Sequence, residues 1–283
     1  MPDLQGGLEE LRIGTVLAAV DGSEYGLAAL QAAVRIAALL DAELRVLHVE
    51  DSDLLGLPSV PWIKEMDPLS GEIRQLQAVE VERKVRWEST RVRRALDRVL
   101  VHTQLRWSFS VTRGRVVSEL LEAAKTADLI SLGVRRHSLG LGPGSSARAV
   151  IEHSGKPVMM VWRGARMGKR VCVLFDGSPE ALKGLALACR LTRDRDSELF
   201  LILDAPGEER ARLVEAAASS LRSAEDAGAE ISIVPREAAW KVACHLRRLA
   251  CGLLVIPRAA MQRSEAVAAG IREGLECPLL ILG

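Results

Sequence analysis

Short apolar runs alternate along the chain with longer segments in which apolar residues recur every three or four positions. In the first half, the runs predict five strands, near residues 14–20, 44–49, 105–111, 128–133 and 157–162. The periodic segments between them predict four helices, near residues 23–40, 72–101, 115–126 and 145–154. Nearly continuous apolar strands separated by helices are typical of a parallel sheet with helices on both faces.

The same pattern begins again in the second half. The segment TVLAAVDGS at 15–23 is matched by RVCVLFDGS at 170–178, an offset of 155 residues. Strands of the second half are expected near 170–175, 198–203, 229–234, 252–256 and 278–282. Toward the end of each copy, Lys156-Pro157-Val158 matches Cys277-Pro278-Leu279, where the offset has fallen to 121. The second copy is therefore 34 residues shorter. Much of the difference is attributed to residues 51–74, whose prolines and glycines predict an irregular insertion.

The repeat predicts both the fold class and the domain organisation. The fold is α/β, with two tandem doubly wound domains at residues 1–165 and 166–283, each an open, mostly parallel five-stranded sheet with helices on both faces. A length of 283 residues suits two such cores. Ligands of these sheets bind beyond the carboxyl ends of the strands, where the winding direction switches, so the first and fourth strands are the places to inspect.

Composition narrows the classes of function. No apolar run approaches the roughly 18–20 residues that span a bilayer, and the chain does not start with a basic segment followed by an apolar one. We therefore expect a cytoplasmic protein without membrane insertion. The 38 basic residues nearly balance the 37 acidic ones, which disfavours a nucleic-acid partner. The cysteines form no C-x-x-C pair and the histidines have no metal-ligand spacing, so neither predicts a metal site.

The first strand ends in Asp21-Gly22-Ser23. Gly22 permits a tight turn, and Ser23 is placed to cap the helix that follows. Asp21 could accept a hydrogen bond from a ribose hydroxyl, or it could be a carboxylate that only stabilises the turn. The tripeptide alone leaves both interpretations open.

The fourth strand runs into a glycine-rich loop, GVRRHSLGLGPGSS at 133–146, which is followed by a predicted helix. A helix N-terminus offers unpaired N–H groups and the positive end of a dipole, and Ser145 and Ser146 add hydroxyls, so phosphate oxygens would bind here. Arg135 and Arg136 could add charge-assisted contacts. The alternative is a flexible loop in which Ser145 merely caps the helix.

Together, the strand-end Asp-Gly-Ser, the glycine loop ending in Gly-Ser, and the helix and Pro-Val strand that follow resemble the universal stress protein family over nearly the whole chain. The family's loop pattern is Gly, two residues, Gly, nine residues, Gly, then Ser or Thr, and members that keep it bind ATP. Here Gly133 matches the first glycine, whereas Arg136 replaces the second. Gly144 and Ser145 match the end of the pattern after seven residues instead of nine.

The resemblance implies a set of nucleotide contacts. Asp21 would contact the ribose and Val49, at the end of the second strand, would pack near the adenine. The phosphates would be cradled by Gly133, Gly144, Ser145 and Ser146. Arg136 could either obstruct the phosphates or supply an extra contact. The implied ligand is ATP, or ADP or AMP, with or without Mg²⁺.

The second copy departs further from the family's pattern. Its fourth strand ends in Val255-Ile256-Pro257, and Glu265 stands where the first copy has Gly144, so a carboxylate would repel phosphate there. We expect this half to be a degenerate partner that pairs pseudo-symmetrically with the first, as in the homodimers of the family. The apolar edges at 157–162 and 278–282 are the candidate contacts. A homodimer of the whole chain and an unidentified protein partner are further expectations.

Some residues that look functional have a simpler interpretation. His48 lies inside a strand and is expected to be structural, and His137 is expected to be an exposed loop residue. The helix predicted at 72–101 carries charges of both signs, which favours a solvated, salt-bridged face over a nucleic-acid surface. The basic residues are Arg83, Lys84, Arg86, Arg91, Arg93, Arg94 and Arg98, and they are interleaved with Glu72, Glu80, Glu82, Glu88 and Asp97.

Three functional hypotheses follow. The leading one, which depends on the family resemblance, is a cytoplasmic stress-response regulator that binds ATP or another adenine nucleotide in its first domain. The second is a ligand-free interaction module, which the Arg136 substitution favours. The third is a slow ATP hydrolase or phosphotransferase that uses Asp21 and a bound Mg²⁺. The sequence has no recognisable set of nucleophile, base and oxyanion donor, so a binding role is preferred to an enzymatic one.

Overall fold

The computed structural model describes residues 11–60, 62–66, 71–101, 103–135, 145–193, 197–203, 207–223, 230–232, 246–263 and 275–283. The first half contains, in order, β1 (Thr15–Ala19), α1 (Glu24–Leu40), β2 (Glu43–Asp51), α2 (Ser52–Gly56), the 3₁₀ turn η1 (Leu57–Ser59), β3 (Lys64–Met66), β4 (Ile73–Gln75), α3 (Ala78–Leu100), β5 (Trp107–Gly114), α4 (Val116–Ala124), β6 (Leu129–Gly133), α5 (Ser145–His153) and β7 (Val158–Val161). The second half contains β8 (Arg170–Phe175), α6 (Pro179–Leu191), β9 (Glu198–Leu203), α7 (Gly207–Ser223), β10 (Glu230–Ser232), β11 (Leu253–Pro257), α9 (Arg258–Arg263) and β12 (Leu279–Leu282).

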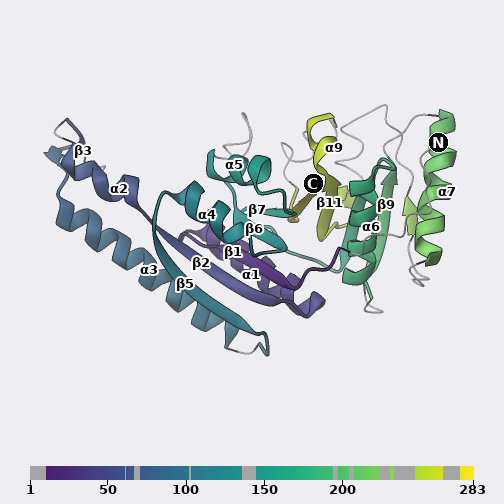
Figure 1. Ribbon diagram of the computed structural model, residues 1–283, viewed down its shortest axis with the longest axis horizontal. Helices are drawn as coiled ribbons and strands as arrows, with labels where there is room; N and C mark the ends of the chain where they lie inside the picture. The colour runs from purple at the N-terminus through teal and green to yellow at the C-terminus, as the bar shows by residue number, and fades with distance from the viewer. Residues whose placement is uncertain are drawn as a thin grey trace.

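The predicted fold class is confirmed, because each half contributes five parallel strands with helices on both faces (Figure 1). The strand order is β7-β6-β1-β2-β5 in the first half and β12-β11-β8-β9-β10 in the second, which is the same winding. Thr15 lies opposite Glu43 and Arg170 lies opposite Glu198, so both pairs of first and second strands have the same register. The sequence repeat is therefore a structural repeat.

The two sheets are joined edge to edge into one sheet of ten strands. The joint is an antiparallel pairing of β7 with β12, in which Met160 lies opposite Leu279 and Val158 opposite Ile281. These are the two apolar edges that the sequence analysis named as candidate contacts. Trp162, at the end of β7, is fully buried, and its indole N–H donates to the carbonyl of Leu275 from the other half.

Each face of the long sheet carries its own hydrophobic core, and each core extends across both halves. One core lies under α1, α3 and α6 and includes Leu30, Leu96 and Leu185. The other lies under α4, α5 and α9 and includes Leu120 and Val150. In Figure 1, α4 and α5 lie above the strands of the first half, whereas α1 and α3 lie below them.

The insertion at 51–74 is more ordered than expected. β2 continues to Asp51, whose carboxylate accepts a hydrogen bond from the Asp53 N–H at 2.9 Å and caps α2. A short antiparallel hairpin, β3–β4, follows and pairs Glu65 with Arg74. Because residues 73–75 form β4, α3 begins at Ala78 and not near residue 72 as predicted.

Candidate functional site

A cavity of about 300 Å³ lies beyond the carboxyl ends of β1, β2 and β6. β1 sits between β6 and β2, so the chain leaves β1 toward one side for β2 and reaches β6 on the other. This is the switch point at which doubly wound sheets bind ligands. The bottom of the cavity is apolar and is formed by strand-end side chains: Ala19, Leu47, Val49 and Leu132.

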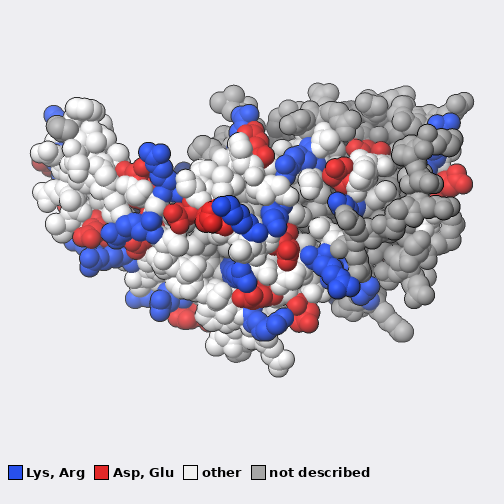
Figure 2. Space-filling model, in the orientation of Figure 1, with Lys and Arg blue, Asp and Glu red and all other residues white. Residues whose placement is uncertain are grey.

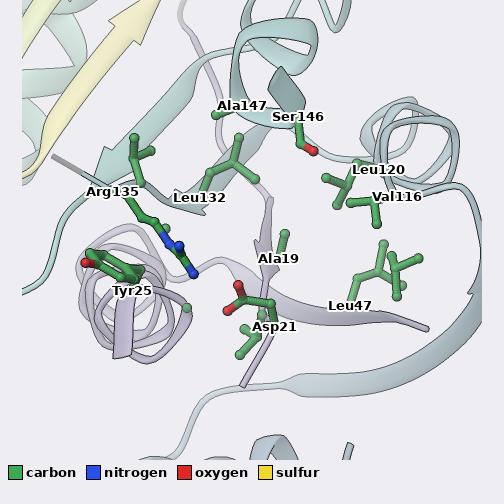
Figure 3. Close-up of a pocket in the computed structure, with 15 residues that line it drawn as sticks. Ala19, Asp21, Tyr25, Leu47, Val116, Leu120, Leu132, Arg135, Ser146 and Ala147 are labelled. Carbon is green, nitrogen blue, oxygen red and sulfur yellow. The ribbon is translucent and has the colours of Figure 1, made fainter. Parts of the chain in front are cut away.

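Three helices build the walls of this cavity (Figure 3). The start of α1 supplies Tyr25 on one side, and α4 supplies Val116 and Leu120 on the other. The first turn of α5 closes the cavity from above with Ser146 and Ala147, and the Ser146 hydroxyl points inward. The N-terminus of α5, where the first N–H groups have no carbonyl partner within the helix and the helix dipole is positive, therefore borders the cavity.

Asp21 lies at the edge of the cavity and also forms the turn predicted for it. Gly22 has a φ of +73°, which favours glycine, and Asp21 Oδ1 accepts hydrogen bonds from the Ser23 N–H at 3.0 Å and the Ser23 hydroxyl at 2.6 Å. The Ser23 hydroxyl oxygen in turn accepts from the Gly26 N–H at 3.1 Å and caps α1. Among the described residues Asp21 Oδ2 has no hydrogen-bond partner, so one oxygen stabilises the turn while the other is available to a ligand.

The second half contains the same turn. Gly177 has a φ of +75°, and Asp176 Oδ1 accepts from the Ser178 N–H at 3.1 Å and the Ser178 hydroxyl at 2.6 Å. The Ser178 hydroxyl then caps α6 by accepting from the Ala181 N–H at 3.2 Å. Because the turn is the same in both halves, the Asp-Gly-Ser motif by itself reports how the helix starts and does not identify a ligand site.

Gly133 is required by packing as well as by its place in the loop. A Cβ atom at this position would lie 2.5 Å from the carbonyl carbon of Tyr25 and 2.7 Å from the Gly26 nitrogen, both in the backbone of α1. A glycine here therefore lets the start of α1 approach the end of β6. The strand registers place Pro257 at the equivalent position of the second half.

Arg135 is the cation of the described cavity. Its guanidinium carbon lies 5.7 Å from the centroid of the Tyr25 ring, and the side chain extends between Tyr25 and Asp21 (Figure 3). Arg136, His137 and Gly144 lie outside the described residues, and of Ser145 only the backbone, at the start of α5, is described. Of the predicted site residues, the structure brings together Asp21, Val49, Gly133, Arg135 and Ser146.

The sequence analysis did not identify three residues of the walls. Tyr25 is the second residue after the Asp-Gly-Ser turn, where an aromatic side chain at the start of a helix could have been noticed. Val116 and Leu120 are four residues apart, so they lie on one face of α4, but nothing in the sequence indicates that this face meets the end of β2.

The surroundings of His48 and of two cysteines indicate structural roles. His48 is 2% exposed, and its Nδ1 lies 2.8 Å from the carbonyl oxygen of Val20. Cys251 Sγ lies 3.6 Å from Cys277 Sγ, and burial raises the pKa of the Cys251 thiol well above its usual range. Within the described ranges, no group of three or more His, Cys, Asp or Glu residues could hold a metal ion, and no helix is both long and apolar enough to cross a membrane.

Comparison with known proteins gives a family and a fold. A model of the universal stress protein family matches residues 12–161. A universal stress protein from Archaeoglobus fulgidus DSM 4304 has a similar structure, with a TM-score of 0.70 at 15% identity over 96% of this chain and 97% of that one. A putative universal stress protein from Pseudomonas aeruginosa UCBPP-PA14 has a TM-score of 0.59 at 15% identity, over 96% of this chain and 94% of that one. A search of curated proteins gives no significant match.

Proposed function

The chain belongs to the universal stress protein family. On this basis we propose that its first half is a receptor for an adenine nucleotide: ATP, ADP or AMP. The cavity at the switch point supports this most directly, since it combines an apolar bottom with a carboxylate, a guanidinium and a helix N-terminus. Its volume of about 300 Å³ is at the lower end of the range usual for small-molecule sites.

Each chemical part of a nucleotide has a matching group in the cavity. The apolar strand ends, Val49 among them, and the α4 face at Val116 and Leu120 suit a base. Asp21 Oδ2 can accept a hydrogen bond from a ribose hydroxyl without disturbing the turn, which uses Oδ1.

The phosphates would bind where positive charge gathers. The N–H groups of the first turn of α5 and the Ser146 hydroxyl can donate to phosphate oxygens, and Arg135 can add a charge-assisted hydrogen bond. We extend this proposal to Gly144, Ser145 and Arg136, which adjoin the same turn in sequence. A Mg²⁺ ion, if present, would be held chiefly by the phosphates, with Asp21 as the nearest carboxylate of the cavity.

The second half is proposed to be a partner without a nucleotide. Pro257, at the position of Gly133, has no N–H to offer a phosphate, and α9 begins at the next residue, Arg258. The pairing of β7 with β12 supports a pseudo-symmetric arrangement in which this half completes the sheet beside the receptor. A regulator of this kind would signal occupancy through its partners, in keeping with a stress response in the cytoplasm.

The first test is to denature freshly purified protein, identify any released nucleotide by chromatography, and titrate ATP, ADP and AMP by calorimetry. We expect binding near one nucleotide per chain. Absence of binding to all three nucleotides would sink the receptor proposal and leave a ligand-free regulatory module. Arg135 favours that alternative, because its guanidinium already has a partner without a ligand, the Tyr25 ring at 5.7 Å.

The site itself is tested by Ser146→Glu, with Ser118→Glu as its matched control. Both serines lie in the first turn of a helix, where a carboxylate is favourable to the helix, but Ser118 is exposed and outside the cavity. Ser146→Glu should weaken nucleotide affinity by at least about tenfold through repulsion of phosphate, whereas Ser118→Glu should change it by less than about twofold. Equal effects of the two substitutions would show that the ligand binds elsewhere.

A further inference from the structure

The stretch from α2 to the end of α3, here called the arm, carries five of the six large apolar side chains that are more than half exposed among the described residues. The exposed fractions of these five run from 57% for Trp87 to 81% for Trp62, and the other three are Met66, Ile73 and Val79. Outside the arm, among described residues, Val101 is the one other large apolar side chain more than half exposed. Such a concentration marks an interaction surface, because single exposed apolar residues are normally scattered.

Beside these residues runs a line of basic side chains on α3. Arg83, Trp87, Arg91, Arg94 and Arg98 follow one another at intervals of four, four, three and four residues, so they lie along one side of the helix. The four arginines are exposed, and Arg91 lies over the Trp87 ring at 4.8 Å. We call these five residues, with the neighbouring exposed Lys84, the basic stripe.

Three of the acidic residues near the stripe pair with cations that do not belong to it. Glu65 and Glu80 pair with Arg74, and Glu82 pairs with Arg86. Glu88 and Asp97 lie within one turn of stripe residues on α3 and offset part of their charge. No described acidic residue forms an ion pair with any of the cations of the basic stripe. The stripe therefore presents an excess of positive charge, while Glu80 and Glu82 of the same helix form salt bridges of the kind that the sequence analysis favoured.

The apolar end of the arm and the basic stripe form one continuous surface. A hollow between the hairpin and α3 is lined by Glu65 and Arg74 of the hairpin and by four residues of the helix: Glu80, Arg83, Lys84 and Trp87. In Figure 2 the end of the arm, at the left of the molecule, is largely uncharged, and Lys and Arg side chains lie just below it with Asp and Glu side chains among them.

We propose that the arm docks on the surface of a phospholipid bilayer that contains anionic lipids. Lys and Arg of the basic stripe would contact the phosphate groups, while Trp62, Trp87 and Ile73 would lie at the level of the headgroups, where tryptophan is favoured. The contact is peripheral, because the apolar face of α3 is occupied by the sheet: Val85, Val92 and Leu96 are buried. This function goes beyond nucleotide binding and does not depend on it.

Two other partners fit the surface less well. A second copy placed on the arm with two-fold symmetry would bring two basic stripes together, and like charges oppose that contact. A nucleic acid would match the cations, but it would leave the exposed aliphatic side chains of Met66, Ile73 and Val79 without a favourable partner. An anionic bilayer uses both the charge and the apolar side chains.

The experiment is co-sedimentation of the full-length protein with vesicles of phosphatidylcholine, either alone or mixed equally with phosphatidylglycerol, at low and at high salt. The charge variant is Arg83→Glu/Arg91→Glu/Arg94→Glu. Its control, Arg35→Glu/Arg193→Glu/Arg212→Glu, makes the same change in net charge at exposed arginines away from the arm. The apolar variant is Trp62→Ser/Ile73→Ser, and its control is Trp107→Ser/Leu39→Ser, at exposed apolar positions elsewhere. Thermal unfolding of each variant verifies that it is folded.

We expect the protein to sediment with the anionic vesicles and not with the neutral ones, and to be released by salt. The charge variant should lower the partition coefficient by at least about tenfold and the apolar variant by about threefold, with both controls within about twofold of the original chain. Failure to sediment with anionic vesicles at low salt, or an equal loss in the control with three substitutions, would overturn the proposal. A dimer that is detected by light scattering and dissociates in the apolar variant would also overturn it. So would binding to a DNA duplex that is lost in the charge variant, if the original protein does not bind vesicles.

Discussion

The two halves of the molecule have the same turn after their first strand but differ at the end of their fourth strand. The comparison distinguishes residues required by the fold from residues that could bind a ligand. Both first strands lead into an Asp-Gly-Ser turn with the same hydrogen bonds, so this turn belongs to the architecture. The fourth strands diverge. β6 ends in Gly133, packed against the backbone of α1, whereas β11 ends in Pro257 and leads directly into α9. The cavity lies at the end of β6. The residues at the end of the fourth strand are therefore a better indicator of a ligand site than the Asp-Gly-Ser turn.

The largest effect in this comparison is expected from Gly133→Ala. The new Cβ would lie 2.5 Å from the backbone of α1, which cannot move without disturbing the start of the helix, so the free energy of unfolding should fall by roughly 2–3 kcal/mol. Gly56→Ala is the control, because a Cβ there meets nothing within 4 Å. Urea denaturation followed by circular dichroism measures both, and a loss below about 1 kcal/mol for Gly133→Ala would show that α1 is not held against β6.

The next prediction uses the duplicated turn. Asp21→Asn keeps an oxygen that can accept the turn hydrogen bonds but removes the charge, and it should weaken nucleotide binding about tenfold, or about 1.4 kcal/mol. Asp176→Asn makes the same change in a half that we propose to be without ligand, and it should leave binding unchanged. Calorimetric titration compares the two. An equal loss of nucleotide affinity in the two variants would indicate that both halves bind nucleotide. It would contradict the proposal that only the first half does.

A smaller and symmetrical effect is expected at the two helix caps. Ser23→Ala and Ser178→Ala each remove a side chain that accepts a hydrogen bond from the first turn of its helix, at 3.1 Å in α1 and 3.2 Å in α6. Each should cost about 1 kcal/mol of stability. Thermal unfolding of the two variants should give shifts that agree closely, and a cost confined to one half would mean that the turns differ in strength despite their common geometry.

The smallest expected effect on stability comes from the Cys251 thiol. It lies in the second half, which holds all five cysteines. Because burial raises the pKa of the Cys251 thiol, this group should remain protonated at pH 8 and react with iodoacetamide much more slowly in the folded protein than in urea. Because this pKa is higher in the folded than in the unfolded protein, the free energy of unfolding is unaffected by Cys251 below the ordinary thiol pKa. It should decrease as the pH rises above that value. Mass spectrometry of the peptide that contains Cys251 gives the rate, and rapid labelling of the native protein would contradict a buried thiol.

Much of the fold could be predicted because its strands are continuous apolar runs with clear borders. The β8 and β9 strands were predicted with the bounds that the structure has, and the shared offset of 155 residues anticipated the shared register. The hairpin β3–β4 was missed because its strands are three residues long and exposed on both faces, which leaves no alternation of apolar and polar residues to detect.

The candidate site could be predicted only in part. Asp21, Gly133 and Ser146 stand at strand or helix ends that the repeat locates, so they could be named from the sequence. Tyr25, Val116 and Leu120 enter the cavity because α1 and α4 cross the sheet at particular places, and that depends on contacts between distant segments. The basic stripe was also hard to see in sequence order, because its cations are three or four residues apart and line up on one side only in the helix.

The antiparallel pairing of β7 with β12 has a consequence for how the two halves could diverge. In an assembly of two identical chains every substitution occurs twice, and a change that harms one site harms the other. Here one polypeptide supplies both sides of the joint, so the partner is present at a fixed ratio of one to one and is not lost on dilution. A residue such as Pro257 can therefore change one half while the other half keeps Gly133, and the joint between them is preserved.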